Sequence, residues 1–413
     1  MDFEDTPQEA AFRQEARAWL DKNARRKSHP NETWASTLDD KSRDNIVRLA
    51  KAFQIRKYDD GWACLHWPKE YGGRGCTSIE RVIYGQEEAN YIMPRGVVDI
   101  GQGMAGPILM AYASEKQQQR YLQPMARGEE IWCQLFSETG AGSDLAGLRM
   151  KAEKQGDDWC LNGEKIWTSG AHYCDYGIVV ARSDPNVPKH RGLTFFFLDL
   201  KSAGISIEPI RQITGSSHFN TVIFDNVKVP DSQRLGKVGD GWRVAMATLM
   251  NERVSVGDAP GPDFEQIFAL TNSIELNGKP AVENDAIRSQ LARWYYQTAG
   301  LKYTKMRSVS ALSRGATPGP ENSITKLVSA KKAQEIAKLG VDLMGMAGVI
   351  RDPKLVESGG QFQQAYLQSP AMRIAGGTDE ILRNIIAERV LGLPQDPRAD
   401  KGLAFNEIPS GQK

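Results

Sequence analysis

The sequence is short of the residues that most often build metal sites and disulfide frameworks. Its 413 residues include only five histidines and five cysteines, and no two cysteines have C-x-x-C spacing. A structural zinc site needs about four such ligands at close spacing, and a disulfide framework normally uses an even set of cysteines. The sequence therefore predicts reduced thiols and no metal site.

Long hydrophobic runs and strong net charge are also missing. No apolar run approaches the roughly 20 residues that a transmembrane helix needs, and residues 1–27 lack the apolar core of a signal peptide. The net charge is +1, so nothing indicates a nucleic-acid or membrane-surface binder. We expect a cytoplasmic protein that binds neither nucleic acid nor membrane.

The nucleotide-hydrolysing and acyl-hydrolysing motifs are absent as well. No Walker loop occurs, and no serine has the G-x-S-x-G surroundings of a nucleophile elbow. Kinase and hydrolase functions therefore have no residues to support them.

Hydrophobic spacing divides the chain into three regions. Residues 1–130 show helical spacing, residues 131–240 carry short strand-like runs separated by turn residues, and helical spacing returns after Gly241. We expect an α+β protein with an N-terminal helical domain (1–130), a middle antiparallel β domain (131–240) and a C-terminal helical domain (241–413).

Local signals predict particular turns and ends. Asn162-Gly163 predicts a β-hairpin turn, because both residues tolerate positive φ. Thr378 followed by Asp379 and Glu380 predicts the start of a final helix. The polar tail after Pro394 is expected to be mobile.

Three segments have the composition of ligand-binding turns. Ser137–Asp144 (sequence SETGAGSD) follows an apolar run, and its glycines let the backbone approach a flat or anionic ligand. Trp167-Thr168-Ser169 places a ring next to small hydroxyl side chains. The third segment, Gly376–Arg383, reads GGTDEILR. Each segment alone is also compatible with an ordinary turn, and Trp167 with core packing.

Together, the three segments resemble those of the acyl-CoA dehydrogenase family. The family pattern T-E-P-G-A-G-S-D corresponds to Ser137–Asp144, its W-x-T segment to Trp167–Ser169, and its G-T-x-x-I-x-R segment to Gly377–Arg383. The order of the segments and the helical–β–helical layout match too. The resemblance implies the family fold, whose C-terminal domain is a four-helix bundle. It also implies FAD-dependent oxidation of an acyl-CoA thioester to the 2,3-enoyl-CoA in lipid metabolism.

The resemblance assigns cofactor contacts in the β domain. It implies that the backbone around Phe136 and Ser137 meets the pyrimidine side of the flavin. Gly142 and Ser143 would face the cofactor pyrophosphate and the substrate entrance.

Further cofactor contacts follow from the other two segments. By resemblance, Trp167 stacks beside the flavin and Ser169 hydrogen-bonds near its N5 edge. Thr378 and Glu380 would contact the adenosine-ribose part of FAD, although Glu380 is also explained as a partner of the helix dipole.

The catalytic base departs from the commonest family pattern. Many members carry a Glu just before the G-T of the C-terminal segment, where this sequence has Gly376. Isovaleryl- and long-chain-type members place it in a Glu-Arg pair, and Glu252-Arg253 fits that position. We therefore expect Glu252 to take the α-proton, Arg253 to position the helix or the substrate, and the Gly376 N–H to bind the thioester oxygen. Without that family frame, Glu252 and Arg253 would be a solvated ion pair.

A second departure concerns assembly. The family often has an R-x-x-F-G segment whose Arg reaches the FAD of a neighbouring subunit, but no such Arg precedes Gly278-Lys279-Pro280. The resemblance implies an electron-transfer flavoprotein as electron acceptor and a homodimer or homotetramer. The departure leaves a heterotetramer open, and a related flavin oxidase or desulfinase is a further alternative.

Overall fold

The computed structural model describes residues 5–28, 34, 42–255, 261–312, 319–320, 322–352, 355–356 and 359–409. By their contacts, these residues form two compact units. The first unit takes in Met1–Lys27, Glu32–Ser255 and Asp396–Lys413, and the second takes in Ser28–Asn31 and Val256–Gln395. Helix α6 (Gly241–Ser255) thus belongs with the β domain by contacts, although its secondary structure resembles that of the second unit.

The predicted N-terminal helical region is confirmed. Its α-helices are α1 (Pro7–Asn23), α2 (Arg43–Asp59), α3 (Ser78–Glu88), α4 (Gly106–Tyr112) and α5 (Glu115–Arg127). Thr6 and Thr77 begin α1 and α3 with capping boxes, in which the hydroxyl accepts a backbone N–H and a glutamate three residues later accepts the N–H of the cap residue. These caps satisfy backbone N–H groups that have no partner within the helix.

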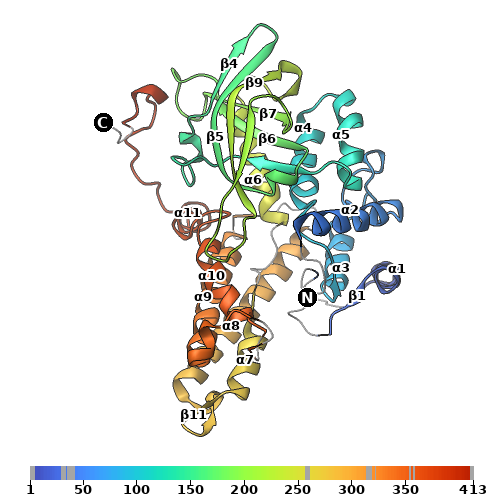
Figure 1. Ribbon diagram of the computed structural model, residues 1–413, viewed down its shortest axis with the longest axis vertical. Helices are drawn as coiled ribbons and strands as arrows, with labels where there is room; N and C mark the ends of the chain where they lie inside the picture. Colours follow the sequence, from blue (N-terminus) through green and yellow to red (C-terminus); the bar gives the residue numbers. More distant parts are fainter. Residues whose placement is uncertain are drawn as a thin grey trace. The chain divides into compact units, whose positions relative to one another are not determined.

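The β domain is a single, mostly antiparallel sheet with strand order β10-β7-β6-β4-β5-β9-β8 (Figure 1). Strand β3 adds to it by pairing parallel to β6. The strands are β3 (Trp132–Leu135), β4 (Lys151–Gln155), β5 (Asp158–Ser169), β6 (Tyr176–Arg182), β7 (Leu193–Asp199), β8 (Ile205–Pro209), β9 (Phe219–Pro230) and β10 (Arg234–Leu235).

Strands β6 and β7 are buried on both faces because alternate residues enter two different cores. Phe195 and Phe197 pack with residues of α4, α5 and α6, whereas Phe196 packs with residues of β5 and β9. All three rings are fully buried. Since side chains alternate along a strand, residues of α4, α5 and α6 cover one face of these two strands, and residues of β5 and β9 cover the other.

The predicted hairpin at Asn162-Gly163 is wrong. Strand β5 runs through both residues, and its pairing with β9 shifts register between Leu161 and Gly163. Gly163 has φ +141 and marks a bulge rather than a turn. The hairpin lies earlier, where Gln155 pairs with Asp158 across a two-residue turn.

One G-x-G-x-x-G spacing occurs in the chain, at Gly101, Gly103 and Gly106, but it does not form a dinucleotide-binding turn. The segment lies in continuous helix, the π-helical stretch Gly101–Ala105 followed by α4. Gly106 is required by packing, because a Cβ there would lie 2.1 Å from Cζ2 of the fully buried Trp67. The spacing therefore reflects close packing of a helix against a ring.

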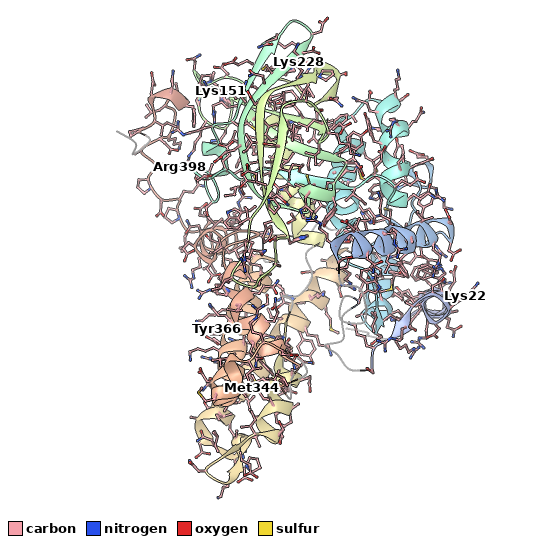
Figure 2. All side chains as sticks on the ribbon, viewed as in Figure 1. Lys22, Lys151, Lys228, Met344, Tyr366 and Arg398 are labelled. Atoms are coloured by element: carbon pink, nitrogen blue, oxygen red, sulfur yellow. The ribbon has the colours of Figure 1, made fainter. Side chains whose placement is uncertain are left out.

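The second unit is helical, as predicted. Helices α7 (Phe264–Ser273), α8 (Asp285–Leu312), α9 (Asn322–Leu343) and α10 (Gln361–Met372) pack around Trp294, Ile336 and Phe362, and α11 (Asp379–Ile385) follows. Figure 2 labels Tyr366 on α10 and Met344 directly after α9. A two-residue turn at Asn277-Gly278, both with positive φ, joins β11 (Glu275–Leu276) to β12 (Lys279–Pro280).

The C-terminal tail is not the free chain that its polar sequence suggests. Residues 396–409 return to the β domain, where Ala404 forms a β-bridge with Pro188 and the Phe405 N–H donates to the Val187 carbonyl at 3.0 Å. A polar composition is compatible with docking when hydrogen bonds and ion pairs supply the contacts.

The close contact between Gly106 and Trp67 predicts that a side chain at position 106 destabilises the fold. We expect Gly106→Ala to lower the free energy of unfolding by about 1–3 kcal/mol, because the methyl group must displace Trp67. The matched control is Gly85→Ala in α3, where a Cβ meets no atom within 4 Å and the change should be neutral or stabilise by roughly 0.5–1 kcal/mol. Urea unfolding of both variants measures the difference, and equal stabilities would contradict the prediction.

Candidate functional site

The Ser137–Asp144 loop begins where β3 ends. The Phe136 ring is buried edge-on against Phe195, with ring centroids 5.7 Å apart. Glu138 and Ala141 exchange two backbone hydrogen bonds of 3.0 Å, which close a tight turn. Gly142 and Ser143 follow on the exposed side of this turn. The loop therefore has a rigid base and an open, glycine-lined edge.

A buried ion pair holds the base of the loop. The Lys165 ammonium, fully buried on β5, lies 2.8 Å from the Glu138 carboxylate and donates to the Phe136 carbonyl at 3.0 Å. The carboxylate also accepts the backbone N–H groups of Arg149 (2.6 Å) and Met150 (2.9 Å). Burial lowers the pKa of Lys165, and the Glu138 carboxylate opposes that change. The pair thus ties the backbone at Phe136 to the backbone at Arg149 and Met150.

The Trp167–Ser169 segment ends β5 beside this loop. The Ile166 N–H donates to the Ser137 carbonyl at 2.8 Å, which joins the two predicted flavin segments directly. Trp167 is 54% exposed and has φ +60, a rare conformation for a bulky residue. Its ring touches only the edge of Phe219 among aromatic neighbours in the described chain. Core packing therefore does not explain Trp167.

The residues between Trp167 and Gly170 alternate in exposure. Trp167 and Ser169 share the open side of the strand end, whereas Thr168 is buried with its hydroxyl unpaired. An exposed indole, an accessible hydroxyl and strained backbone at one place are typical of a ligand site. The residues present fit the flavin that the resemblance implies: Phe136 and Ser137 would hold its ring edge, and Trp167 and Ser169 its side.

The third predicted segment forms a turn in the second unit. Gly376 and Gly377 have φ +65 and +94, and Arg373 closes the turn by an ion pair of 2.6 Å with the buried Asp379. The Lys326 ammonium donates to the Gly377 carbonyl. Gly376 thus lies exposed at the apex of a braced turn.

Helix α11 begins directly after that turn. Thr378 is its N-cap, as predicted, and its hydroxyl accepts the Ile381 N–H at 3.2 Å. Glu380 is exposed in the first turn. The structure therefore brings Gly376, Thr378 and Glu380 together within the second unit.

The predicted base lies on α6. Residues Glu252 and Arg253 fall in the last turn of this helix, and their side chains lie outside the described residues. Their catalytic and positioning roles remain predictions.

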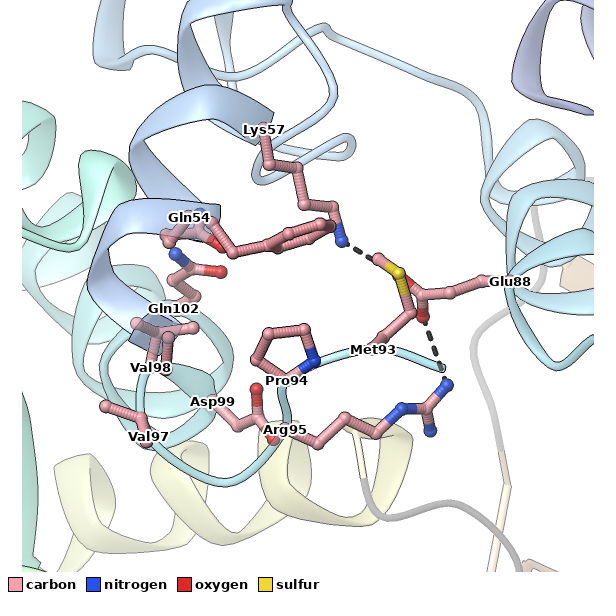
Figure 3. Close-up of a pocket in the computed structure, with 12 residues that line it drawn as sticks. Gln54, Lys57, Glu88, Met93, Pro94, Arg95, Val97, Val98, Asp99 and Gln102 are labelled. Atoms are coloured by element: carbon pink, nitrogen blue, oxygen red, sulfur yellow. Dashed lines mark hydrogen bonds and ion pairs between the residues drawn. The ribbon is translucent and has the colours of Figure 1, made fainter. Parts of the chain in front are cut away.

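A separate small cavity lies among the N-terminal helices (Figure 3). It measures about 220 Å³, and its charged lining includes Lys57, Glu88 and Arg95. Glu88 accepts from Lys57 at 2.9 Å and lies 3.2 Å from Arg95. Burial lowers the pKa of Lys57, but the charge and hydrogen bonding of Glu88 together with those of Tyr84 outweigh burial, so the pKa is raised. The charges are satisfied internally, so this cavity has no evident catalytic group.

Sequence reasoning missed the residues that brace the site. Lys165 and Arg373 each form an ion pair with an acidic residue of a predicted segment, Glu138 and Asp379. The available signal was weak: Lys165 directly precedes Ile166 and Trp167, and a lysine that is buried needs an acidic partner. Among the described residues no cluster of three potential metal ligands occurs, and no helix has the length and apolar character to span a membrane.

Protein-family models match three consecutive parts of the chain. They are the acyl-CoA dehydrogenase N-terminal domain (residues 6–129), middle domain (133–227) and C-terminal domain (239–391). Among solved structures, the Tcur3481-Tcur3483 steroid ACAD superimposes with a TM-score of 0.75 at 26% identity, covering 96% of this chain and all of the other. The ChsE4-ChsE5 complex from Mycobacterium tuberculosis gives a TM-score of 0.74 at 26% identity, covering 96% and 100%.

Named relatives agree with these matches. The acyl-CoA dehydrogenase IpdE1 of Mycobacterium tuberculosis is 38% identical over 84% of this chain and 89% of its own length. The acyl-CoA dehydrogenase FadE34 of the same organism is 37% identical over 83% of this chain, but this chain spans only 46% of FadE34. With all three domains matched in order, the chain belongs to the acyl-CoA dehydrogenase family.

Proposed function

We propose that this protein is an FAD-dependent dehydrogenase that oxidises an acyl-CoA thioester to its 2,3-enoyl form and passes the electrons to an electron-transfer flavoprotein. The observation that carries the proposal is the direct joining of two flavin-type segments by the Ile166–Ser137 hydrogen bond, with Trp167 exposed and strained beside it. The Ser137–Asp144 loop has a rigid base and exposed glycines, so a flat cofactor and a thioester can approach its backbone closely.

In the proposed reaction, separate residues take the proton, stabilise the developing charge and bind the cofactor. A bound flavin supplies the acceptor for the hydride from the β-carbon. Glu252 takes the α-proton, and the Gly376 N–H donates to the thioester oxygen, where negative charge develops as the proton leaves. Arg253 positions the helix that carries the base. Thr378 and Glu380 contact the adenosine end of the cofactor.

We also propose a bulky, ring-bearing acyl group as substrate. Gly376 has no side chain where many family members carry a glutamate, which leaves room beside the thioester. The Tcur3481-Tcur3483 structure is described as a steroid ACAD. Anaerobic bleaching of the bound flavin by straight-chain and ring-bearing acyl-CoA thioesters tests both proposals, because an enzyme bleached by no thioester is not a dehydrogenase of this class.

A second candidate is one subunit of a hetero-oligomeric dehydrogenase. Two of the similar structures carry paired names, Tcur3481-Tcur3483 and ChsE4-ChsE5. The turn at Gly278-Lys279-Pro280 lacks the arginine that the family uses toward a neighbouring FAD. A partner chain of the same family would then complete the cofactor site.

The catalytic base gives the first test of mechanism. We expect Glu252→Gln to retain the fold and FAD but to slow flavin reduction by about a hundredfold or more, equal to about 2.7 kcal/mol of barrier, because the proton acceptor is gone. Stopped-flow bleaching with a verified substrate measures this rate.

The control for that test is Glu265→Gln, which removes an exposed carboxylate from α7 and should not change the rate. Adding Gly376→Glu to Glu252→Gln should restore only part of the activity, because φ +65 disfavours a side chain at that position. Wild-type bleaching by Glu252→Gln would exclude this residue as the base.

The buried pair gives a test of cofactor support. We expect Lys165→Met to lower the free energy of unfolding by about 3–5 kcal/mol and to weaken FAD retention, because it leaves the Glu138 carboxylate buried without its cation. The double change Lys165→Met with Glu138→Gln should recover part of both losses. Chemical unfolding and FAD titration measure them.

The control for the pair is Lys201→Met, since Lys201 is 74% exposed beside Asp175 and an exposed pair contributes only about 0–1 kcal/mol. Equal effects at Lys165 and Lys201 would show that the buried pair has no special role.

Assembly is tested by light scattering together with the flavin spectrum. We expect a yellow homodimer or homotetramer if the chain completes its own cofactor site. Protein that is colourless alone and gains FAD only with a second chain of the family would instead establish the hetero-oligomer. A fully active monomer would contradict both.

A further inference from the structure

The strained residue Trp167 lies in a β-bulge near the end of β5. Lys165 pairs with Val222 of β9. The next pair along is Thr168 with Asn220, so β5 advances by three residues where β9 advances by two. A bulge interrupts the ladder of backbone hydrogen bonds and re-aims the side chains beside it, and here Trp167 takes φ +60. Contacts outside the regular ladder must therefore hold this strand end in place.

The Asn220 side chain supplies such contacts. It is fully buried, and its Nδ2 donates to the Thr168 carbonyl at 2.9 Å and to the His218 carbonyl at 3.2 Å. The His218 carbonyl also accepts the Gly170 N–H at 2.9 Å. The backbone on both sides of Ser169 is thus tied to residues at the start of β9.

His172 determines which way the Asn220 amide faces. Both N–H groups of the amide are used on carbonyl oxygens, so its Oδ1 must accept, and Nδ1 of His172 lies 2.8 Å from that oxygen. The reverse orientation would place Oδ1 against two carbonyl oxygens. The hydrogen-bond pattern therefore assigns a proton to Nδ1. Nε2 of the same ring is buried without a partner among the described residues, so the imidazole acts through Asn220.

The imidazole is uncharged at neutral pH. Burial lowers the pKa of His172, and the nearby charge of Arg43 lowers it further; the Asn220 hydrogen bond and Asp44 raise it, but the net shift is downward. The Tyr173 ring packs edge-on against the imidazole, with centroids 4.9 Å apart. A neutral, packed ring with its proton on Nδ1 supplies Asn220 with one directional donor.

We propose that Asn220 and His172 are positioning residues, which keep the Trp167–Ser169 segment in the conformation that binds FAD. Both act through the backbone at Thr168, between the two residues that we assign to the cofactor. Neither lies in the three segments that resemble those of the family. The inference rests on the proposed function in taking FAD as the ligand beside Trp167.

Two substitutions at His172 separate its hydrogen bond from its bulk. His172→Asn keeps a nitrogen donor one bond beyond Cγ, in the place of Nδ1, whereas His172→Leu fills the space without a donor. We expect His172→Leu to speed the release of FAD from the holoenzyme about five- to tenfold, through loss of one hydrogen bond, and His172→Asn to stay within about twofold of wild type. The rise of flavin fluorescence on dilution measures release.

The matched control is Asn162→Leu. Asn162 closes the other bulge of the same strand pair, between Leu161 and Gly163, where its Oδ1 accepts the Asn226 N–H at 2.8 Å. This substitution should destabilise the fold but leave FAD release unchanged, because that bulge carries no predicted cofactor contact. Equal FAD release from His172→Leu and Asn162→Leu overturns the proposal, since it indicates general support of the sheet.

Hydrogen–deuterium exchange of the backbone at residues 166–170 measures the positioning itself. Exchange should rise in His172→Leu but not in His172→Asn or Asn162→Leu. Asn220→Asp turns a donor toward two carbonyl oxygens into an acceptor, so it should raise exchange and FAD release further. Unchanged exchange in His172→Leu, or a smaller effect of Asn220→Asp, overturns the proposal. If these expectations hold but no acyl-CoA thioester bleaches the flavin, the positioning role stands and the proposed function is overturned instead.

Discussion

The Glu138 carboxylate is nearly shielded from water, and the positions of its partners determine where the candidate loop lies. Lys165 supplies the compensating charge from β5, and the backbone N–H groups of Arg149 and Met150, just before β4, donate two hydrogen bonds to the carboxylate. A buried charge without such partners would cost several kcal/mol, so the arrangement admits few alternatives. Because Lys165 also binds the Phe136 carbonyl, the same charge fixes the backbone that we assign to the cofactor.

The rigid base of the loop explains why its far edge can remain open. Gly142 and Ser143 are exposed, and Trp167 is left exposed in a conformation that bulky residues avoid. Such strain persists only where surrounding structure over-determines it. Here the β5–β9 pairing and the Ile166–Ser137 hydrogen bond hold the backbone of Trp167 in this conformation. Exposed aromatic surface and strained backbone are therefore maintained by the stability of the neighbouring sheet.

In the second unit, charged side chains likewise hold an exposed turn in place. Arg373 and Asp379 close a turn whose two glycines have positive φ, and Lys326 binds one of their carbonyls. An exposed backbone N–H at Gly376 is held in place without any side chain of its own. A glycine at this position is consistent with transfer of the carboxylate role to Glu252, as we propose, and with space for a large acyl group.

The sequence alone determined the family, the helical–β–helical order and the N-cap at Thr378, because these depend on residue type and on spacing along the chain. It also predicted which segments would line the site. It misplaced the hairpin at Asn162-Gly163, since tolerance of positive φ suits a bulge as well as a turn, and only the pairing of β5 with β9 decides between them.

The tertiary structure alone decided three features of the site. It showed that Lys165 neutralises Glu138, that Trp167 is exposed rather than packed in a core, and that the C-terminal segment docks through Phe405 on Arg182. Two of these features join residues that are distant along the chain, and the third depends on which side of β5 the Trp167 side chain takes. Local composition carries little information about such contacts, because the energy of a buried charge or ring depends on the partners that the fold brings to it.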